Sequence, residues 1–137
     1  MLIEKTASRG QGWKNQSIEI DVAANARLTH IRILGDDPTS TATSVIGATV
    51  ARDARYECLT LNTGNAWSRH EYHMRLTGTN GFAGLYGLNL LKGVQFSDTT
   101  ILIEHQAPHC QSSQFFRNLI DDSAHGVFQG KIHVHQV

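Results

Sequence analysis

A unit of about 27 residues recurs along the chain, and this repeat limits the possible folds more than any other feature. In each unit an alternating, strand-like run is followed by a short turn. The turns begin at Asn25, Asp53, Asn80 and Pro108, separated by 53−25 = 28, 80−53 = 27 and 108−80 = 28 residues. A constant period in this range is typical of a solenoid, in which each unit buries its apolar face only against the next.

Each unit contains two extended segments and no long helix. The expected segment pairs are 18–22 with 26–34, 43–51 with 54–61, 71–76 with 82–91 and 99–105 with 112–120, followed by 126–135. The sequence therefore predicts one all-β domain over residues 1–137, a right-handed parallel β-helix with about two strands per coil. A jelly roll or a β-sandwich would also contain many short strands, but neither requires a constant interval between turns.

The charge balance excludes several classes of partner. Lys plus Arg and Asp plus Glu each number 12, so the net charge is zero and gives no general attraction to nucleic acid or anionic lipid. No apolar stretch approaches the ~20 residues of a membrane helix, and the first residues lack the apolar core of a signal peptide. We expect a cytoplasmic protein in which Cys58 and Cys110 are reduced thiols, with Cys58 buried in a strand.

Histidines give the weak candidates for metal binding. His105, His109 and Cys110 surround one turn, and imidazole with thiolate suits zinc or iron. A hydrogen-bonded histidine and a packed thiol explain the same residues without a metal, and we favour that interpretation. No confident metal or cofactor site is predicted.

Two further histidine pairs differ in their spacing. His133 and His135 would share one face of a strand, which leaves open the alternative of a small His-metal β-barrel protein. His70 and His73 would not share a face, and both are expected at the surface.

Two acidic pairs raise the alternative of a carbohydrate-active β-helix enzyme. Such chemistry needs two carboxylates several ångströms apart on either side of a sugar bond. Asp36-Asp37 and Asp121-Asp122 lie at predicted turns, where aspartate is common for backbone reasons. No nucleophile motif or nucleotide-binding motif accompanies them, so we predict no catalytic residue and no enzyme.

The two ends of the chain lack obvious caps. Residues 1–13 are polar and suggest a frayed start, whereas residues 131–137 stop within a predicted strand. An uncovered solenoid end presents unpaired backbone groups and apolar side chains. We therefore expect a piece of a longer protein, or pairing of this strand with a second copy in a homodimer. The interface candidates are Ile132, Val134 and Val137.

Several segments, read together, resemble the core domain of the SufB/SufD family of iron–sulfur cluster assembly proteins, and SufD more than SufB. The most specific is the ending Gly-Val-Phe-x-Gly-Lys-Ile-x-Val over residues 126–134. The others lie at 20–33, 51–56, 68–78, 86–93 and 98–112, the last including Glu104-His105 and Pro108-His109-Cys110. The similarity spans about residues 13–137.

This resemblance implies a right-handed parallel β-helix that acts as a non-catalytic scaffold with SufB and the SufC ATPase. It implies an iron–sulfur cluster in the full complex and no cofactor in this segment. Family members also carry helical regions on both sides of the core, which this sequence does not contain. The histidine associated with cluster formation in SufD follows the Gly-Val-Phe ending, so no family site residue maps onto this chain.

Overall fold

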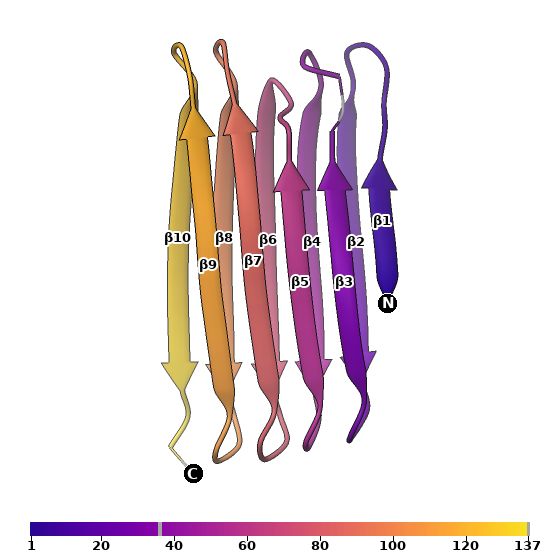
Figure 1. Ribbon diagram of the computed structural model, residues 1–137, viewed down its shortest axis with the longest axis vertical. Coiled ribbons are helices and arrows are strands. Elements are labelled where there is room, and N and C mark those ends of the chain that lie inside the picture. Colours follow the sequence, from indigo (N-terminus) through magenta and orange to yellow (C-terminus); the bar gives the residue numbers. More distant parts are fainter. Residues whose placement is uncertain (36, 137) are drawn as a thin grey trace.

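The computed structural model describes residues 1–35 and 37–136, and within them the chain forms ten β-strands and no helix (Figure 1). The described chain therefore has no helix long and apolar enough to cross a membrane. Two strands make one coil, and the chain winds with a right-handed sense through five coils (Figure 1). The strands are β1 (Leu2–Thr6), β2 (Trp13–Val22), β3 (Arg27–Leu34), β4 (Thr41–Val50), β5 (Arg55–Asn62), β6 (Trp67–Leu76), β7 (Phe82–Leu91), β8 (Phe96–His105), β9 (Gln111–Ile120) and β10 (His125–Val134).

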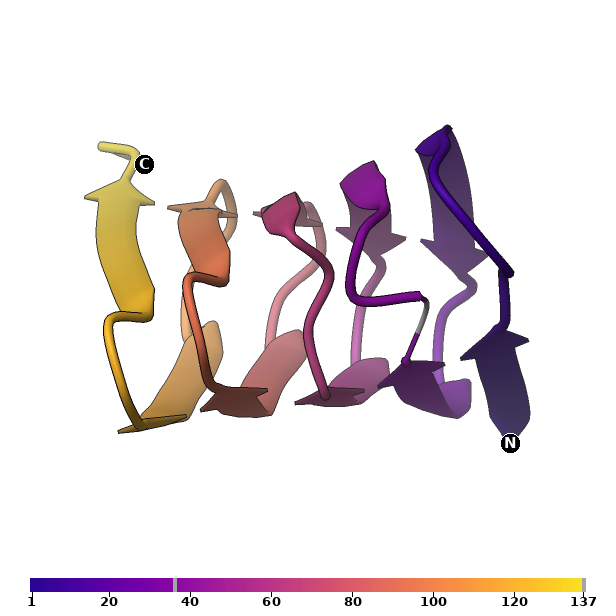
Figure 2. The same ribbon diagram turned by 90° about the horizontal axis from the view of Figure 1, so that it is seen from above.

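The strands form two parallel sheets that face each other (Figure 2). The odd sheet has the order β1-β3-β5-β7-β9, and the even sheet has the order β10-β8-β6-β4-β2. Every neighbouring pair is parallel, and within the described residues neither sheet closes on itself. The parallel solenoid is therefore confirmed, and the jelly roll and the sandwich are excluded because both need antiparallel strands.

Inward side chains stack in columns that run through successive coils. One column in the even sheet joins Ile20, Ala48, Met74, Ile103 and Ile132, each the register partner of the next. The three central members are fully buried. A single coil could not remove these side chains from water, so the hydrophobic core exists only because neighbouring coils stack in register.

The predicted turns are confirmed by the backbone. Asn25, Asp53 and Asn80 adopt positive φ angles of 63°, 56° and 60°. Asn and Asp tolerate this left-handed conformation better than other non-glycine residues. At the fourth turn the equivalent residue is His109, with a φ of 61°, one position later than predicted. Pro108 is instead equivalent to Thr79, since the Asn80 amide donates to the Pro108 carbonyl as the Asp53 amide donates to that of Thr79.

The expectation of a frayed start over residues 1–13 is wrong. Leu2–Thr6 forms β1, which pairs with β3 in parallel from Leu2 opposite His30 to Thr6 opposite Leu34. The strands of the even sheet also begin earlier than predicted; β2, for example, begins at Trp13 rather than at residue 18. These stretches are polar and show no clear alternating hydrophobic pattern, so the sequence does not indicate them as strands. They form strands because their backbone pairs with a strand one coil away.

The buried face of β3 is not the one that its isoleucines indicate. His30 and Arg32 point into the solenoid and are fully buried, whereas Ile31 and Ile33 point outward and stay partly exposed. This orientation places two basic side chains between the sheets, next to the first coil.

Candidate functional site

A buried ion pair lies between the first coils. The Arg32 guanidinium donates from Nε to Glu4 Oε2 at 2.9 Å, from Nη1 to the Tyr72 hydroxyl at 3.2 Å and from Nη2 to Ser44 Oγ at 3.3 Å. A buried charge is tolerated only when it is paired and hydrogen-bonded, and these partners meet that condition. The Arg32 network thus joins both sheets and holds β1 against β3.

His30 extends this network on the odd sheet. Its Nε2 lies 3.2 Å from Glu4 Oε2, and its Nδ1 lies 2.9 Å from the Tyr56 hydroxyl. Burial lowers the pKa of His30, but Cys58 and the Glu4 carboxylate raise it more strongly, to about 9. For Glu4, burial raises the pKa, whereas hydrogen bonds from His30 and Arg32 outweigh burial and bring the pKa to about 2. Both groups are therefore charged at neutral pH.

His70 lies at the other edge of the network, and the expectation that it is a surface residue is wrong. It is only 3% exposed, whereas His73 is exposed as expected. Burial, and secondarily the charge of Arg32, lowers the pKa of His70 to about 3, so the ring is neutral. Its Nδ1 lies 2.7 Å from Ser44 Oγ.

The second nitrogen of His70, Nε2, is buried without a protein partner, as is Thr6 Oγ1. Both residues line one cavity of about 10 Å³, about the size that seats one water molecule. The cavity is too small for a substrate, so the Arg32 network is a structural element of the first coils. Sequence reasoning missed it because residue identity does not reveal which of two alternating faces points inward.

The predicted group of His105, His109 and Cys110 is divided among separate contacts. His105 Nε2 lies 3.0 Å from Ser112 Oγ, and burial lowers the pKa of His105. The Cys110 thiol lies 3.4 Å from the Gly78 carbonyl and packs against the core, while His109 is exposed at its turn. Their ligand atoms do not gather at one point as a metal requires.

The other candidates from the sequence have equally clear positions. Cys58 is buried as predicted, and it and Cys110 are free thiols. Asp37 caps its own turn by accepting hydrogen bonds from the Thr39 amide and hydroxyl, while Asp36 lies outside the described residues. Asp122 occupies a turn with a φ of 55°. These positions match the turn interpretation of the acidic pairs.

The last described coil carries an apolar surface on its inward face. The inward-facing side chains of Ile132 and Val134 are 53% and 69% exposed, and Val137 lies outside the described residues. Phe128 on the same strand is also exposed, and Ile120 on β9 is exposed at the other end of the coil, where its side chain lies next to Gly126. We call these four residues, Ile120, Phe128, Ile132 and Val134, the terminal apolar face. Exposed apolar side chains along one face of a coil mark a surface on which another element or a partner packs.

The His133–His135 pair lies on the opposite, outward side of β10. His133 is the register partner of Glu104 on β8, so the two histidines share their face of the even sheet with a carboxylate. Sequence reasoning found the shared face but not Glu104, which precedes His133 by one coil.

Comparison with known proteins gives one consistent result. The family model described as "SUF system FeS cluster assembly, SufBD core domain" matches residues 1–137. A SufBD family protein of Synechocystis is 31% identical over 124 residues, which cover 90% of this chain and 27% of that protein. The iron–sulfur cluster assembly protein SufD of Escherichia coli is 31% identical over 117 residues, 85% of this chain and 28% of that protein. The chain thus spans between a quarter and a third of the length of these relatives.

Proposed function

This chain belongs to the SufBD family of SUF iron–sulfur cluster assembly proteins, and on that basis we propose that it is a non-catalytic scaffold component acting with SufB and the SufC ATPase. The observation that carries the proposal is the match of the SufBD core-domain model to all 137 residues. In this proposal the iron–sulfur cluster is the cargo of the assembled complex rather than a resident cofactor of this chain. We place this activity in the cytoplasm.

The packing of the solenoid is consistent with a scaffold. The ionisable groups with the largest pKa shifts belong to the enclosed Arg32 network, where no substrate can reach them. Perturbed groups at a catalytic centre normally line an accessible cleft. Among the described acidic residues, Asp37 caps its own turn and Asp122 takes a turn conformation, which gives no support to the carbohydrate-active alternative.

We propose that the terminal apolar face contacts SufB. Parallel strands with exposed inward side chains can accept further strands, and an apolar centre is the usual energetic focus of a protein interface. Ile132 and Val134 are the two most exposed members of this surface and stack on Ile103 and His105 of the preceding coil. A polar substitution there changes exposed side chains, although Ile132 also stacks on the buried Ile103, so the fold of each variant must be checked by circular dichroism.

Co-purification tests this proposal. The chain is co-expressed with SufB and SufC from the same genome, and the amount retained on tagged SufB is measured. The wild-type chain should be retained, whereas Ile132→Glu combined with Val134→Glu should reduce retention at least about tenfold, because a charge would be buried at the interface.

The matched control is Gln129→Glu, which adds a carboxylate to the opposite, exposed face of the same strand. It should leave retention unchanged. Absence of wild-type retention would contradict the proposed partnership, and equal retention of the double variant would contradict the assigned surface. Light scattering of the chain alone tests the homodimer expected from the sequence, which would occupy the same face.

A further inference from the structure

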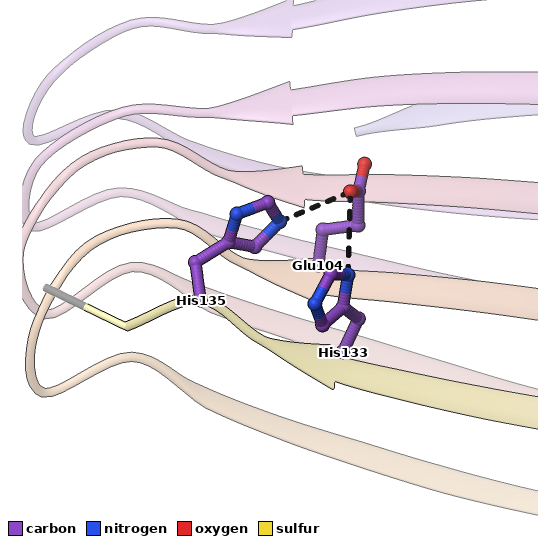
Figure 3. Close-up of side chains that lie close together, drawn as sticks. All are labelled: Glu104, His133 and His135. Atoms are coloured by element: carbon purple, nitrogen blue, oxygen red, sulfur yellow. Dashed lines mark hydrogen bonds and ion pairs between the residues drawn. The ribbon is translucent and has the colours of Figure 1, made fainter.

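A cluster of two histidines and one glutamate lies on the outer face of the even sheet, away from the terminal apolar face (Figure 3). Glu104 near the end of β8 is the register partner of His133 on β10, and His135 follows two residues later. His135 remains in the ladder because its backbone N–H donates to the His105 carbonyl at 2.9 Å. The backbone register therefore holds all three side chains at one place.

The potential ligand atoms converge on the carboxylate. Glu104 Oε1 lies 3.1 Å from His135 Nε2 and 4.0 Å from His133 Nδ1 (Figure 3). One ligand atom from each of the three residues lies within 4.8 Å of the other two. Among the described residues this is the one group of three or more His, Cys, Asp or Glu side chains that meets this distance.

We propose that Glu104, His133 and His135 form a binding site for a divalent transition-metal ion. Two imidazole nitrogens and one carboxylate oxygen are a donor set used by Zn²⁺ with an open fourth position and by Fe²⁺ in facial triads. Metal–ligand bonds of about 2.0–2.2 Å suit the separation of Glu104 Oε1 and His135 Nε2, 3.1 Å, but require His133 Nδ1 to come closer to the carboxylate than its present 4.0 Å. Side-chain rotation achieves this, because His133 and His135 are 54% and 38% exposed and not locked by packing.

The surroundings of Glu104 favour a metal over a competing basic side chain. Arg75 is its register partner on β6, but the Arg75 guanidinium donates to Thr49 Oγ1 at 3.2 Å and lies near Glu19, on the opposite side. The two imidazole rings are stacked with centroids 4.3 Å apart. Nitrogens of both rings are therefore within 4.8 Å of the carboxylate oxygen and of each other, close enough for one ion to bind all three.

The same sheet contains a natural control. His73 on β6 lies 3.7 Å from Glu71 and is similarly exposed, so it repeats the His–Glu pair. It lacks a second imidazole, and His73 and Glu71 belong to no such cluster of three. Removing His73 thus changes the histidine content and surface charge without changing the proposed donor set.

The test is metal titration of the untagged chain after chelator treatment. Co²⁺ is followed by its visible absorption bands, and Zn²⁺ by calorimetry. The wild-type chain should bind one equivalent. Loss of groups that only support a ligand costs about 10–100-fold in affinity, so His133→Ala, His135→Ala and Glu104→Gln should each weaken binding at least about tenfold.

The His73→Ala control should bind like the wild type. The proposal is overturned if the wild-type chain binds no metal at submillimolar concentration, if the three ligand variants bind as tightly as the wild type, or if His73→Ala weakens binding equally. Far-UV circular dichroism and thermal unfolding of each variant separate loss of the site from loss of the fold. Because no partner is present, this result is independent of SufB retention.

Discussion

At the scale of a single residue, the buried charge of Arg32 is compensated by hydrogen-bond partners that lie far away in the sequence. Its partners come from β1, β4 and β6, which lie in three different coils. Removing one partner would leave the charge buried and uncompensated, which is the costly way to break such a network. The first coils are therefore expected to tolerate little polar substitution at inward positions.

The ionisable groups of the Arg32 network predict a maximum of stability near pH 6.5. The pKa of His30 rises from 6.5 to about 9 on folding, so its contribution is complete below pH 6.5 and is lost as pH rises toward 9. The pKa of His70 falls from 6.5 to about 3, so protonation of the unfolded chain lowers stability as pH falls from 6.5 toward 3. Glu4 adds a further loss between pH 4.5 and about 2.

Urea midpoints measured between pH 3 and 9 would reveal this maximum. His30→Gln should flatten the alkaline side of the profile, and His70→Gln should flatten the side between pH 4.5 and 6.5. His125→Gln, at an exposed histidine outside the network, should leave the profile unchanged. A wild-type midpoint that rises steadily from pH 6.5 to 9 would contradict the assignment for His30.

The close packing around Gly78 leads to a second prediction, on stability, at the scale of one residue. A methyl group at this position would overlap the backbone nitrogen of Arg52 in the preceding turn. Because backbone cannot rotate away as a side chain does, Gly78→Ala should lower the free energy of unfolding by about 1–3 kcal/mol. Gly12→Ala is the control, since nothing lies within 4 Å of a methyl group there, and it should change stability by less than about 0.5 kcal/mol. Equal denaturation midpoints for the two variants would refute this interpretation.

At the scale of the strand, stability depends on the face that a residue occupies. Ile103 and Leu102 are neighbours on β8, but Ile103 belongs to the buried column and Leu102 lies on the outer face. Ile103→Ala should therefore cost about 2–5 kcal/mol of unfolding free energy through lost burial and a cavity. Leu102→Ala removes a side chain of similar size and should cost about 1 kcal/mol or less. Chemical denaturation of both variants checks this, and comparable losses would mean that β8 is not packed as described.

The strands also show which elements an alternating pattern can predict. The segment 82–91, whose inward positions are mostly apolar, agrees closely with β7. The sequence pattern did not indicate β1 because its alternation is weak and two of its three inward positions, Glu4 and Thr6, are polar. Such a strand forms because the edge of β3 supplies backbone hydrogen bonds, which no local pattern reports.

At the scale of the whole molecule, the solenoid predicts a gradient of local stability. β6 is paired on both sides, by β4 and β8, whereas within the described residues β1 pairs only with β3 and β10 only with β8. Opening an end coil breaks one coil interface, while opening a central coil breaks two. Amide hydrogen exchange should therefore be slowest in β5 and β6 and faster in β1 and β10. Uniform protection across all ten strands would indicate a single cooperative unit instead.

The repeat determined the fold from sequence because period, alternation and turn residues are local signals that recur in every coil. The left-handed turns at Asn25, Asp53 and Asn80 follow from residue type alone. Only the tertiary structure decided which residues one coil apart meet, because that depends on the number of residues in each complete coil. Glu4 reaches Arg32, and Glu104 reaches His133, through strand register rather than through any motif. The Arg32 network and the part that Glu104 plays were therefore beyond sequence reasoning, although the fold and the shared face of His133 and His135 were within it.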